Sequence, residues 1–253
     1  MVKHSSLSRS WLFEAVFERV LLCVSGVNIT MVSSRDKAPD FSLGADHPIS
    51  YAKRRPSILS GAQRTIDQAG AQLPMADLNE QAALAAEILG SLALEGRHTI
   101  ATAESLTGGA VSAAITSVAG ASQWFERGFV VYTARAKSEM LDVPLELIEK
   151  EGVVSLAVAH AMARGAAARS TADLSVALTG VAGPTGGTPE TPVGTVCIGW
   201  GQKLFDGTVV TAARRINVPG SRATVIAGAK RVALQGLIAL IKGENPAGMP
   251  CEF

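Results

Sequence analysis

A strand-to-helix corner with two adjacent glycines constrains the fold of this chain more than any other feature. The segment before it, residues 98–103, is short and rich in β-branched and apolar residues, which is typical of a buried strand. Residues 110–115 after it are small and apolar, as expected of a helix packed closely on a sheet. Such a corner directs unpaired N–H groups and the positive end of the helix dipole toward a ligand. We call residues 104–109 (Glu-Ser-Leu-Thr-Gly-Gly) the nucleophile corner, because they place a hydroxyl at Ser105; the alternative is that Ser and Thr merely cap the helix.

A second turn-forming segment follows another strand-like run at 174–179. This glycine loop, residues 180–194, is so rich in Gly and Pro that a helix or a central strand is excluded. Ligands of open α/β sheets bind at the carboxyl ends of strands, so we expect the loop to face the nucleophile corner. The loop has neither the Walker A pattern nor the dinucleotide fingerprint. A solvated connection is the alternative interpretation.

Hydrophobic periodicity predicts the other elements of the fold. A helix is expected from Asp77, with Glu80 completing a capping box and Gly96 ending the helix. Further elements are expected as a strand at 128–133, helices at 134–141 and 155–169, a hairpin of 193–200 with 208–218, and a last helix at 221–241. Together they predict an α/β fold: a three-layer α/β/α sandwich with a mixed sheet and a C-terminal antiparallel hairpin.

The composition argues against several classes of protein. With 253 residues, the chain is long enough to build a substantial core. Its formal net charge of +1 argues against a basic surface that binds nucleic acid. Its three cysteines are scattered, and its four histidines lack metal-ligand spacing, so we expect neither a disulfide framework nor a metal site.

The first part of the chain differs in kind from the rest. We expect residues 1–74 to be a disordered extension or a non-native one, residues 75–243 to form the folded domain, and residues 244–253 to be a tail. Residues 11–27 are apolar but carry charges, which favours an amphipathic helix over a membrane span. We therefore expect a cytoplasmic protein without a membrane partner. The alternative is organelle targeting, because residues 1–13 are basic and Ser-rich and lack acids.

Four segments of the chain together resemble one family: 102–109, 125–137, 178–190 and 192–196. In order and spacing they are similar to the C-terminal domain of CinA, a family that includes stand-alone nicotinamide-mononucleotide amidohydrolases. The resemblance spans roughly residues 78–241. It implies an α/β/α sandwich that converts nicotinamide mononucleotide and water to nicotinate mononucleotide and ammonia, with no metal and no cofactor. The sequence leaves open whether the chain forms a homo-oligomer.

The chemistry requires a base beside the serine, because a neutral hydroxyl is a poor nucleophile. The sequence shows no Ser-His-Asp arrangement, and Lys137 is the candidate base. A lysine has an ordinary pKa of about 10.4, so burial or a second positive group would have to lower it. On the residues alone, Lys137 could be an ordinary solvated lysine. The resemblance implies that Ser105, Tyr132 and Lys137 are catalytic, with Tyr132 relaying the proton or holding the ammonium.

The resemblance also implies which residues contact the substrate. Arg222 is expected to pair with phosphate, with a surface arginine as the alternative. Backbone donors are expected from the nucleophile corner, and the glycine loop is expected to wrap the ribose phosphate. The implied set is Thr107, Gly108, Gly109, Thr179, Gly183, Gly186, Gly187, Thr188 and Arg222. Thr191 and Ile226 depart from the family pattern, which often has lysine and arginine there, and both departures reduce the positive charge near the phosphate.

Two other functions compete with hydrolysis of an amide. One is a non-catalytic nucleotide-binding or competence-related interaction module, which would keep the glycine-bearing turns and dispense with Lys137 and Tyr132. The other is a phosphatase or nucleotide pyrophosphatase, which would need acidic metal-binding clusters that the sequence lacks.

Overall fold

Five strands form one mixed sheet in the order β2-β1-β3-β4-β5 in the computed structural model, which describes residues 74–253. The strands are β1 (Ile100–Glu104), β2 (Phe125–Val130), β3 (Leu174–Gly180), β4 (Thr195–Lys203) and β5 (Val209–Asn217). Strand β1 pairs in parallel with β2 and β3, whereas β4 is antiparallel to both β3 and β5. The α/β class, the mixed sheet and the C-terminal hairpin are thus confirmed.

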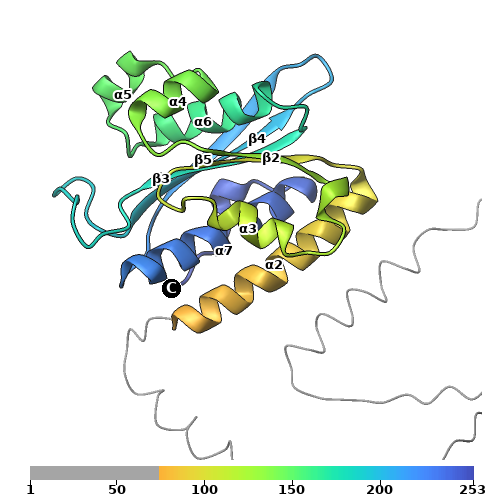
Figure 1. Ribbon diagram of the computed structural model, residues 1–253, viewed down its shortest axis with the longest axis horizontal. Helices are drawn as coiled ribbons and strands as arrows, with labels where there is room; N and C mark the ends of the chain where they lie inside the picture. Colours follow the sequence, from red (N-terminus) through yellow and green to blue (C-terminus); the bar gives the residue numbers. More distant parts are fainter. Residues whose placement is uncertain (1–73) are drawn as a thin grey trace, which may run out of the picture. The chain divides into compact units, whose positions relative to one another are not determined.

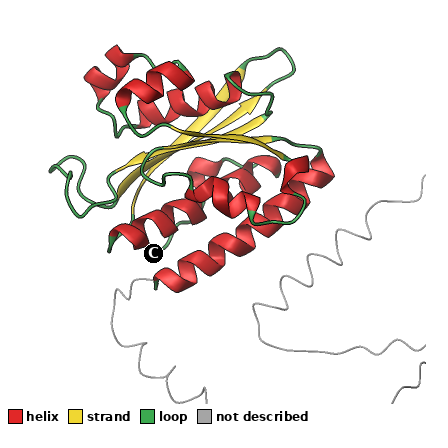
Figure 2. Cartoon of the chain, in the orientation of Figure 1, coloured by secondary structure: helices red, strands yellow, loops and turns green. Residues whose placement is uncertain are grey.

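Helices cover both faces of the sheet (Figure 1; Figure 2). One layer consists of α4 (Ala134–Leu141), α5 (Leu145–Glu151) and α6 (Leu156–Ala168). The opposite layer consists of α2 (Met75–Gly96), α3 (Ala110–Thr116) and α7 (Arg222–Ile241). Two short 3-10 turns, η2 (Ala121–Gln123) and η3 (Pro246–Gly248), complete the described elements. The three-layer sandwich predicted from the sequence is therefore present.

Helix α7 is the central core element of its layer. Its length and apolar composition alone would suit a membrane-crossing helix, but 61% of that apolar window is buried within this fold. The helix lies so close to β4 that a Cβ atom at Gly236 would come within 2.2 Å of the Trp200 ring. The Trp200 indole N–H donates to the Ala233 carbonyl at 3.0 Å, which satisfies the one polar group of a fully buried side chain. The hydrophobicity of α7 thus reflects packing on the sheet.

Several local predictions differ from the structure. Helix α2 begins at Met75 with Pro74 as its N-cap and has no side-chain cap, so the expected capping box at Asp77 is absent. Strand β2 begins three residues before the expected position, because Phe125 already pairs with Ile100 of β1. Helix α5 was not expected, because Pro144 lies just after the expected helix 134–141 and a proline there suits the end of a helix. Proline also favours the start of a helix, and Pro144 is the N-cap of α5.

The last ten residues contact α7. The Arg231 guanidinium donates to the Glu252 carbonyl at 2.6 Å and lies 5.0 Å from the centre of the Phe253 ring. These contacts hold the end of the chain, which the sequence predicted as a tail, against the domain. The predictions made for residues 1–73 lie outside the described residues.

Candidate active site

The carboxyl ends of the three parallel strands bring the predicted site residues to one edge of the sheet. Glu104, the last residue of β1, lies opposite Val130 of β2 and Leu178 of β3. Ser105 follows β1 directly, Tyr132 comes two residues after the end of β2, and the glycine loop follows β3. Strand pairing therefore places the nucleophile corner between the two other loops.

Ser105 and Lys137 are in direct contact. The Lys137 Nζ lies 3.0 Å from the Ser105 Oγ and 3.0 Å from the Val131 carbonyl oxygen. Lys137 lies in the first turn of α4, whose start is fixed by the Thr133 side chain accepting the Ala136 N–H. This turn directs the lysine inward, where its side chain is 0% exposed, while Ser105 is 8% exposed. The alternative of a solvated lysine at residue 137 does not describe this structure.

Burial also changes the acidity of this lysine. The loss of water around the amine lowers the pKa of Lys137 from 10.5 to about 8. Within residues 74–253, no carboxylate forms an ion pair with it, so no negative charge holds the proton on the amine. A substantial fraction of Lys137 is therefore neutral near pH 8 and can accept a proton from Ser105.

Tyr132 is near the site through its backbone. Its carbonyl oxygen lies 3.4 Å from the Ser105 Oγ. Its side chain is 59% exposed, and its hydroxyl accepts a hydrogen bond from Arg222 at 3.3 Å. The hydroxyl makes no hydrogen bond to Ser105 or Lys137 in this structure, so the expected proton relay through Tyr132 is not formed here. Its place in the catalytic set stays a prediction.

The backbone donors of the nucleophile corner differ from those expected. The Gly108 N–H donates to the Ser105 carbonyl at 3.1 Å, and the Gly109 N–H donates to the Glu104 carboxylate at 3.0 Å. Within the described part of the chain, the N–H groups of Leu106 and Thr107 donate to no protein acceptor. The free backbone donors next to Ser105 are thus the N–H groups of residues 106 and 107. Leu106 was not predicted as a donor, because its apolar side chain gives no sequence signal.

Thr107 and Thr179 have different surroundings. The Thr107 Oγ1 is buried and has no hydrogen-bond partner among residues 74–253, which is unusual for a buried polar atom. The Thr179 Oγ1 donates to the Val153 carbonyl at 2.7 Å, and the side chain is fully buried in the face that carries α6. Thr107 therefore has the freer hydroxyl, and a substrate contact of Thr179 stays a prediction.

Two arginines hold the glycine loop through backbone carbonyl groups. Arg222, the first residue of α7, donates to the Gly183 carbonyl at 3.2 Å, and Arg215 of β5 donates to the Glu190 carbonyl. Residues 184–190 of the loop are exposed, including the predicted Gly186, Gly187 and Thr188. The loop and Arg222 thus lie at the site, while Arg215 is an additional residue whose position on a late strand gave no sequence signal.

The two departures from the family pattern also have definite positions. The Thr191 hydroxyl lies 3.0 Å from the Thr188 hydroxyl within the glycine loop. Ile226 packs partly buried against the main core from α7. Only residue 191 therefore lies in the loop expected to contact phosphate.

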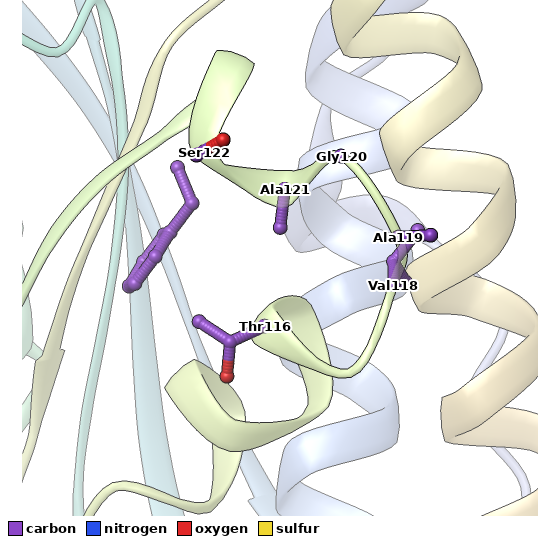
Figure 3. Close-up of a pocket in the computed structure, with 7 residues that line it drawn as sticks. Thr116, Val118, Ala119, Gly120, Ala121 and Ser122 are labelled. Carbon is purple, nitrogen blue, oxygen red and sulfur yellow. The ribbon is translucent and has the colours of Figure 1, made fainter.

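A hollow of about 500 Å³ lies away from these residues (Figure 3). It is lined by Thr116, Val118, Ala119, Gly120, Ala121, Ser122 and Phe125. These residues run from the last residue of α3 to the first residue of β2, at the end of the sheet opposite to Ser105. The chemistry expected at the nucleophile corner has no counterpart in this hollow, because no side chain that lines it is titratable.

The groups around Ser105 suit attack on a carbonyl carbon. Residues 74–253 contain no cluster of three or more His, Cys, Asp or Glu side chains that could hold a metal ion. The site instead combines a hydroxyl, a buried amine and free backbone N–H groups. Such a set can supply a nucleophile, a base and an oxyanion site for acyl transfer.

Known proteins share this chain's sequence pattern and fold. The family model described as "CinA C-terminal domain" matches residues 81–241. A "CinA-like protein" of Chlorobaculum tepidum is 46% identical over 156 residues, covering 62% of this chain and 37% of that protein. A "CinA-like protein" of Mycolicibacterium gilvum is 46% identical over 151 residues, covering 60% of this chain and 35% of that protein. The chain thus spans little more than a third of the length of these relatives.

Solved structures match over nearly their whole length. The competence/damage inducible protein CihA from Agrobacterium tumefaciens is 38% identical, with a TM-score of 0.57 over 68% of this chain and 99% of that one. A competence-damaged protein (CinA) superfamily protein from Escherichia coli is 34% identical, with a TM-score of 0.56 over 67% of this chain and 94% of that one. The described domain therefore corresponds to an independently solved unit.

Proposed function

The chain belongs to the CinA C-terminal domain family, and on this premise we propose that it is an amidohydrolase. Its proposed reaction converts nicotinamide mononucleotide and water to nicotinate mononucleotide and ammonia, within pyridine nucleotide recycling. The observation that carries the proposal is the 3.0 Å contact between the Ser105 Oγ and a buried Lys137 amine. A nucleophile paired with a base of lowered pKa is what acyl transfer by serine requires.

The proposed first half of the reaction forms an acyl-enzyme. Neutral Lys137 keeps one N–H bond to the Val131 carbonyl and uses its lone pair to take the Ser105 proton. The Ser105 Oγ then attacks the carboxamide carbon, and the negative oxygen that forms can be bound by the free N–H groups of residues 106 and 107. Collapse of this intermediate breaks the C–N bond, and the Lys137 ammonium returns the proton to the leaving nitrogen, which departs as ammonia.

The second half of the proposed reaction regenerates the serine. A water molecule gives a proton to Lys137 and attacks the ester carbon. The ester bond breaks, the Ser105 oxygen regains the proton from Lys137, and the nicotinate product leaves. One amine therefore serves as base and then as acid in each half, so no second titratable side chain is needed.

The charge on Arg222 supports an anionic substrate. Its two acceptors, the Gly183 carbonyl and the Tyr132 hydroxyl, are both neutral, and within residues 74–253 no carboxylate pairs with it. A phosphate could replace these neutral acceptors and form two charge-assisted hydrogen bonds with the guanidinium. The substitution of lysine by Thr191 leaves Arg222 as the main cation expected to meet this phosphate.

Replacing Ser105 by alanine tests the proposal. We expect Ser105→Ala to abolish ammonia release while the mononucleotide still binds, because the loop and Arg222 are unchanged. Ammonia release and isothermal titration with nicotinamide mononucleotide measure the two properties. Ser117→Ala, an exposed serine at the end of α3, is the matched control and should behave as wild type. If the Ser105→Ala variant still releases ammonia, the mechanism is excluded. If the wild-type protein binds the mononucleotide but releases no ammonia, the nucleotide-binding module is favoured instead.

A further inference from the structure

Glu104 is a fully buried carboxylate directly before the nucleophile. One oxygen, Oε2, accepts the N–H groups of Gly109 and Val111, both at 3.0 Å. The other, Oε1, accepts the Ser112 N–H at 2.8 Å and the Ser112 hydroxyl at 2.6 Å. A single side chain from the end of β1 thus binds the backbone of the first turn of α3.

The charge of Glu104 is balanced without a cation. Within residues 74–253, no Lys, Arg or His forms an ion pair with this carboxylate. Burial of an uncompensated carboxylate is strongly unfavourable, so these four donors and the positive end of α3 together compensate its charge. The carboxylate also occupies the N–H groups that an anionic ligand would otherwise find at this helix end.

The contacts of Glu104 fix both ends of the turn that carries Ser105. At the start, Glu104 lies in β1, and the Ser105 N–H donates to the Leu178 carbonyl of β3 at 3.0 Å. At the far end, the Gly109 N–H is bound by the Glu104 carboxylate itself. Gly108 and Gly109 adopt φ values of 58° and 102°, which lets the chain reverse direction between these two anchors. Only residues 105–108 lie between the anchored ends.

We propose that Glu104 is a positioning residue of the active site. It holds the turn so that the Ser105 Oγ lies within reach of Lys137 and the N–H groups of residues 106 and 107 stay free for the oxyanion. This inference rests on the proposed amidase function for its catalytic consequence. Glu104 does not hydrogen-bond to Lys137, because its carboxylate binds the start of α3 while Ser105 contacts Lys137 of α4.

Glu104→Gln tests the inference with little change in shape. The variant keeps one acceptor oxygen but places an NH2 group against backbone N–H groups that need an acceptor. We expect kcat for ammonia release to fall about 10- to 100-fold, because small displacements of a nucleophile have costs of that order. KM should stay within about threefold, since the substrate contacts are elsewhere. Ser112→Ala is the matched control: it removes one hydroxyl donor, leaves the three N–H bonds and should lower kcat by less than about threefold.

Amide hydrogen exchange gives a readout that does not depend on turnover. In Glu104→Gln we expect faster exchange at Gly109 and Val111 and also at Ser105, whereas a simple helix-capping role would leave Ser105 protected. If Glu104→Gln fails to fold, Glu104→Asp, which keeps the charge but shortens the reach, replaces it with the same expected pattern.

Two results would overturn the inference. One is a wild-type kcat in the variant despite faster exchange at Gly109 and Val111; the other is unchanged exchange at Ser105. If the wild-type protein releases no ammonia from any pyridine mononucleotide, the proposed function fails, and the exchange pattern at Ser105 alone decides the role of Glu104.

Discussion

The nucleophile corner and the glycine loop both follow parallel strands of the same sheet, but the corner is mostly buried and the middle of the loop is exposed. In the nucleophile corner, Glu104 and the two glycines form hydrogen bonds within the corner or with α3, and Ser105 and Lys137 are buried. In the glycine loop, residues 184–190 are exposed, and arginines bind its carbonyl groups from outside. The two turns therefore differ most in their exposure to solvent.

Under the proposed function, this difference assigns separate roles to the two turns. A buried, internally bonded turn keeps a nucleophile and its base at a defined distance, which bond-breaking steps require. An exposed loop held by a few replaceable contacts can adjust around a ligand, which favours binding and specificity. Changes in the nucleophile corner should therefore act on kcat, and changes around the glycine loop should act on KM.

The largest effect is expected from replacing Lys137, the proposed base. Lys137→Met keeps the length of the side chain and removes its proton acceptor, so kcat should fall about 10²- to 10⁴-fold, as for loss of general base catalysis. Ammonia release under saturating substrate measures this change. If the variant retained more than about a tenth of the wild-type rate, the loss would be too small for removal of the general base and would point to another base.

The same replacement should raise stability, because the wild-type protein buries a group that prefers to be charged. The folded pKa of about 8 lies below the ordinary 10.5, a difference of about 3 kcal/mol at most. The unfolded chain binds the proton more tightly, so this destabilisation is fully present below pH 8 and disappears as the pH rises to 10.5. Lys137→Met should therefore unfold at a higher temperature than wild type at pH 7, with the advantage shrinking above pH 8.

A smaller effect, on binding, is expected at the glycine loop. Arg222→Ala removes the cation expected to meet the phosphate, so KM should rise about 10-fold or more while kcat changes little, since charge-assisted hydrogen bonds contribute roughly 1.5–3 kcal/mol. Arg222→Lys should recover part of the lost affinity, because it keeps the positive charge but not the bidentate hydrogen bonding of the guanidinium. Arg135→Ala, which removes an exposed arginine paired with Glu139, is the control. A large fall in kcat with unchanged KM would contradict the division between the two turns.

The smallest expected effect is the pH dependence of the wild-type rate. Because Lys137 must be neutral to take a proton, kcat should increase with pH through about 8 and level off above it. Between pH 7 and pH 9 the neutral fraction of a group with this pKa rises roughly tenfold, and the rate should follow. A rate that falls across this range would show that the lysine acts in its charged form, contrary to the proposed mechanism.

Sequence reasoning predicted much of the fold because each element carried local signals. Helix α4 has the expected bounds, and α6 and α7 begin directly after Ser155 and Ser221, whose side chains cap them. It failed where a local signal was ambiguous: Pro144, three residues after the end of α4, is the N-cap of α5, and Asp77 lies within the first turn of a helix that begins at Met75. The partners of Tyr132 and Arg222 could not be predicted, because they come from segments 90 residues apart in sequence.

The amino-acid sequence by itself determined the order of the strands and of every α-helix of the domain except α5, the two glycine-bearing turns and the candidacy of Ser105 and Lys137, since these follow from local periodicity and motif. Only the tertiary structure decided that the Lys137 amine is buried against Ser105 and that the Glu104 carboxylate binds the start of α3. It also decided that Arg222 donates hydrogen bonds to both Gly183 and Tyr132. The physical reason is that a pKa, a buried charge and a hydrogen bond across the sheet depend on which distant residues exclude water from a group. Such neighbours are set by the pairing of strands and the packing of helices.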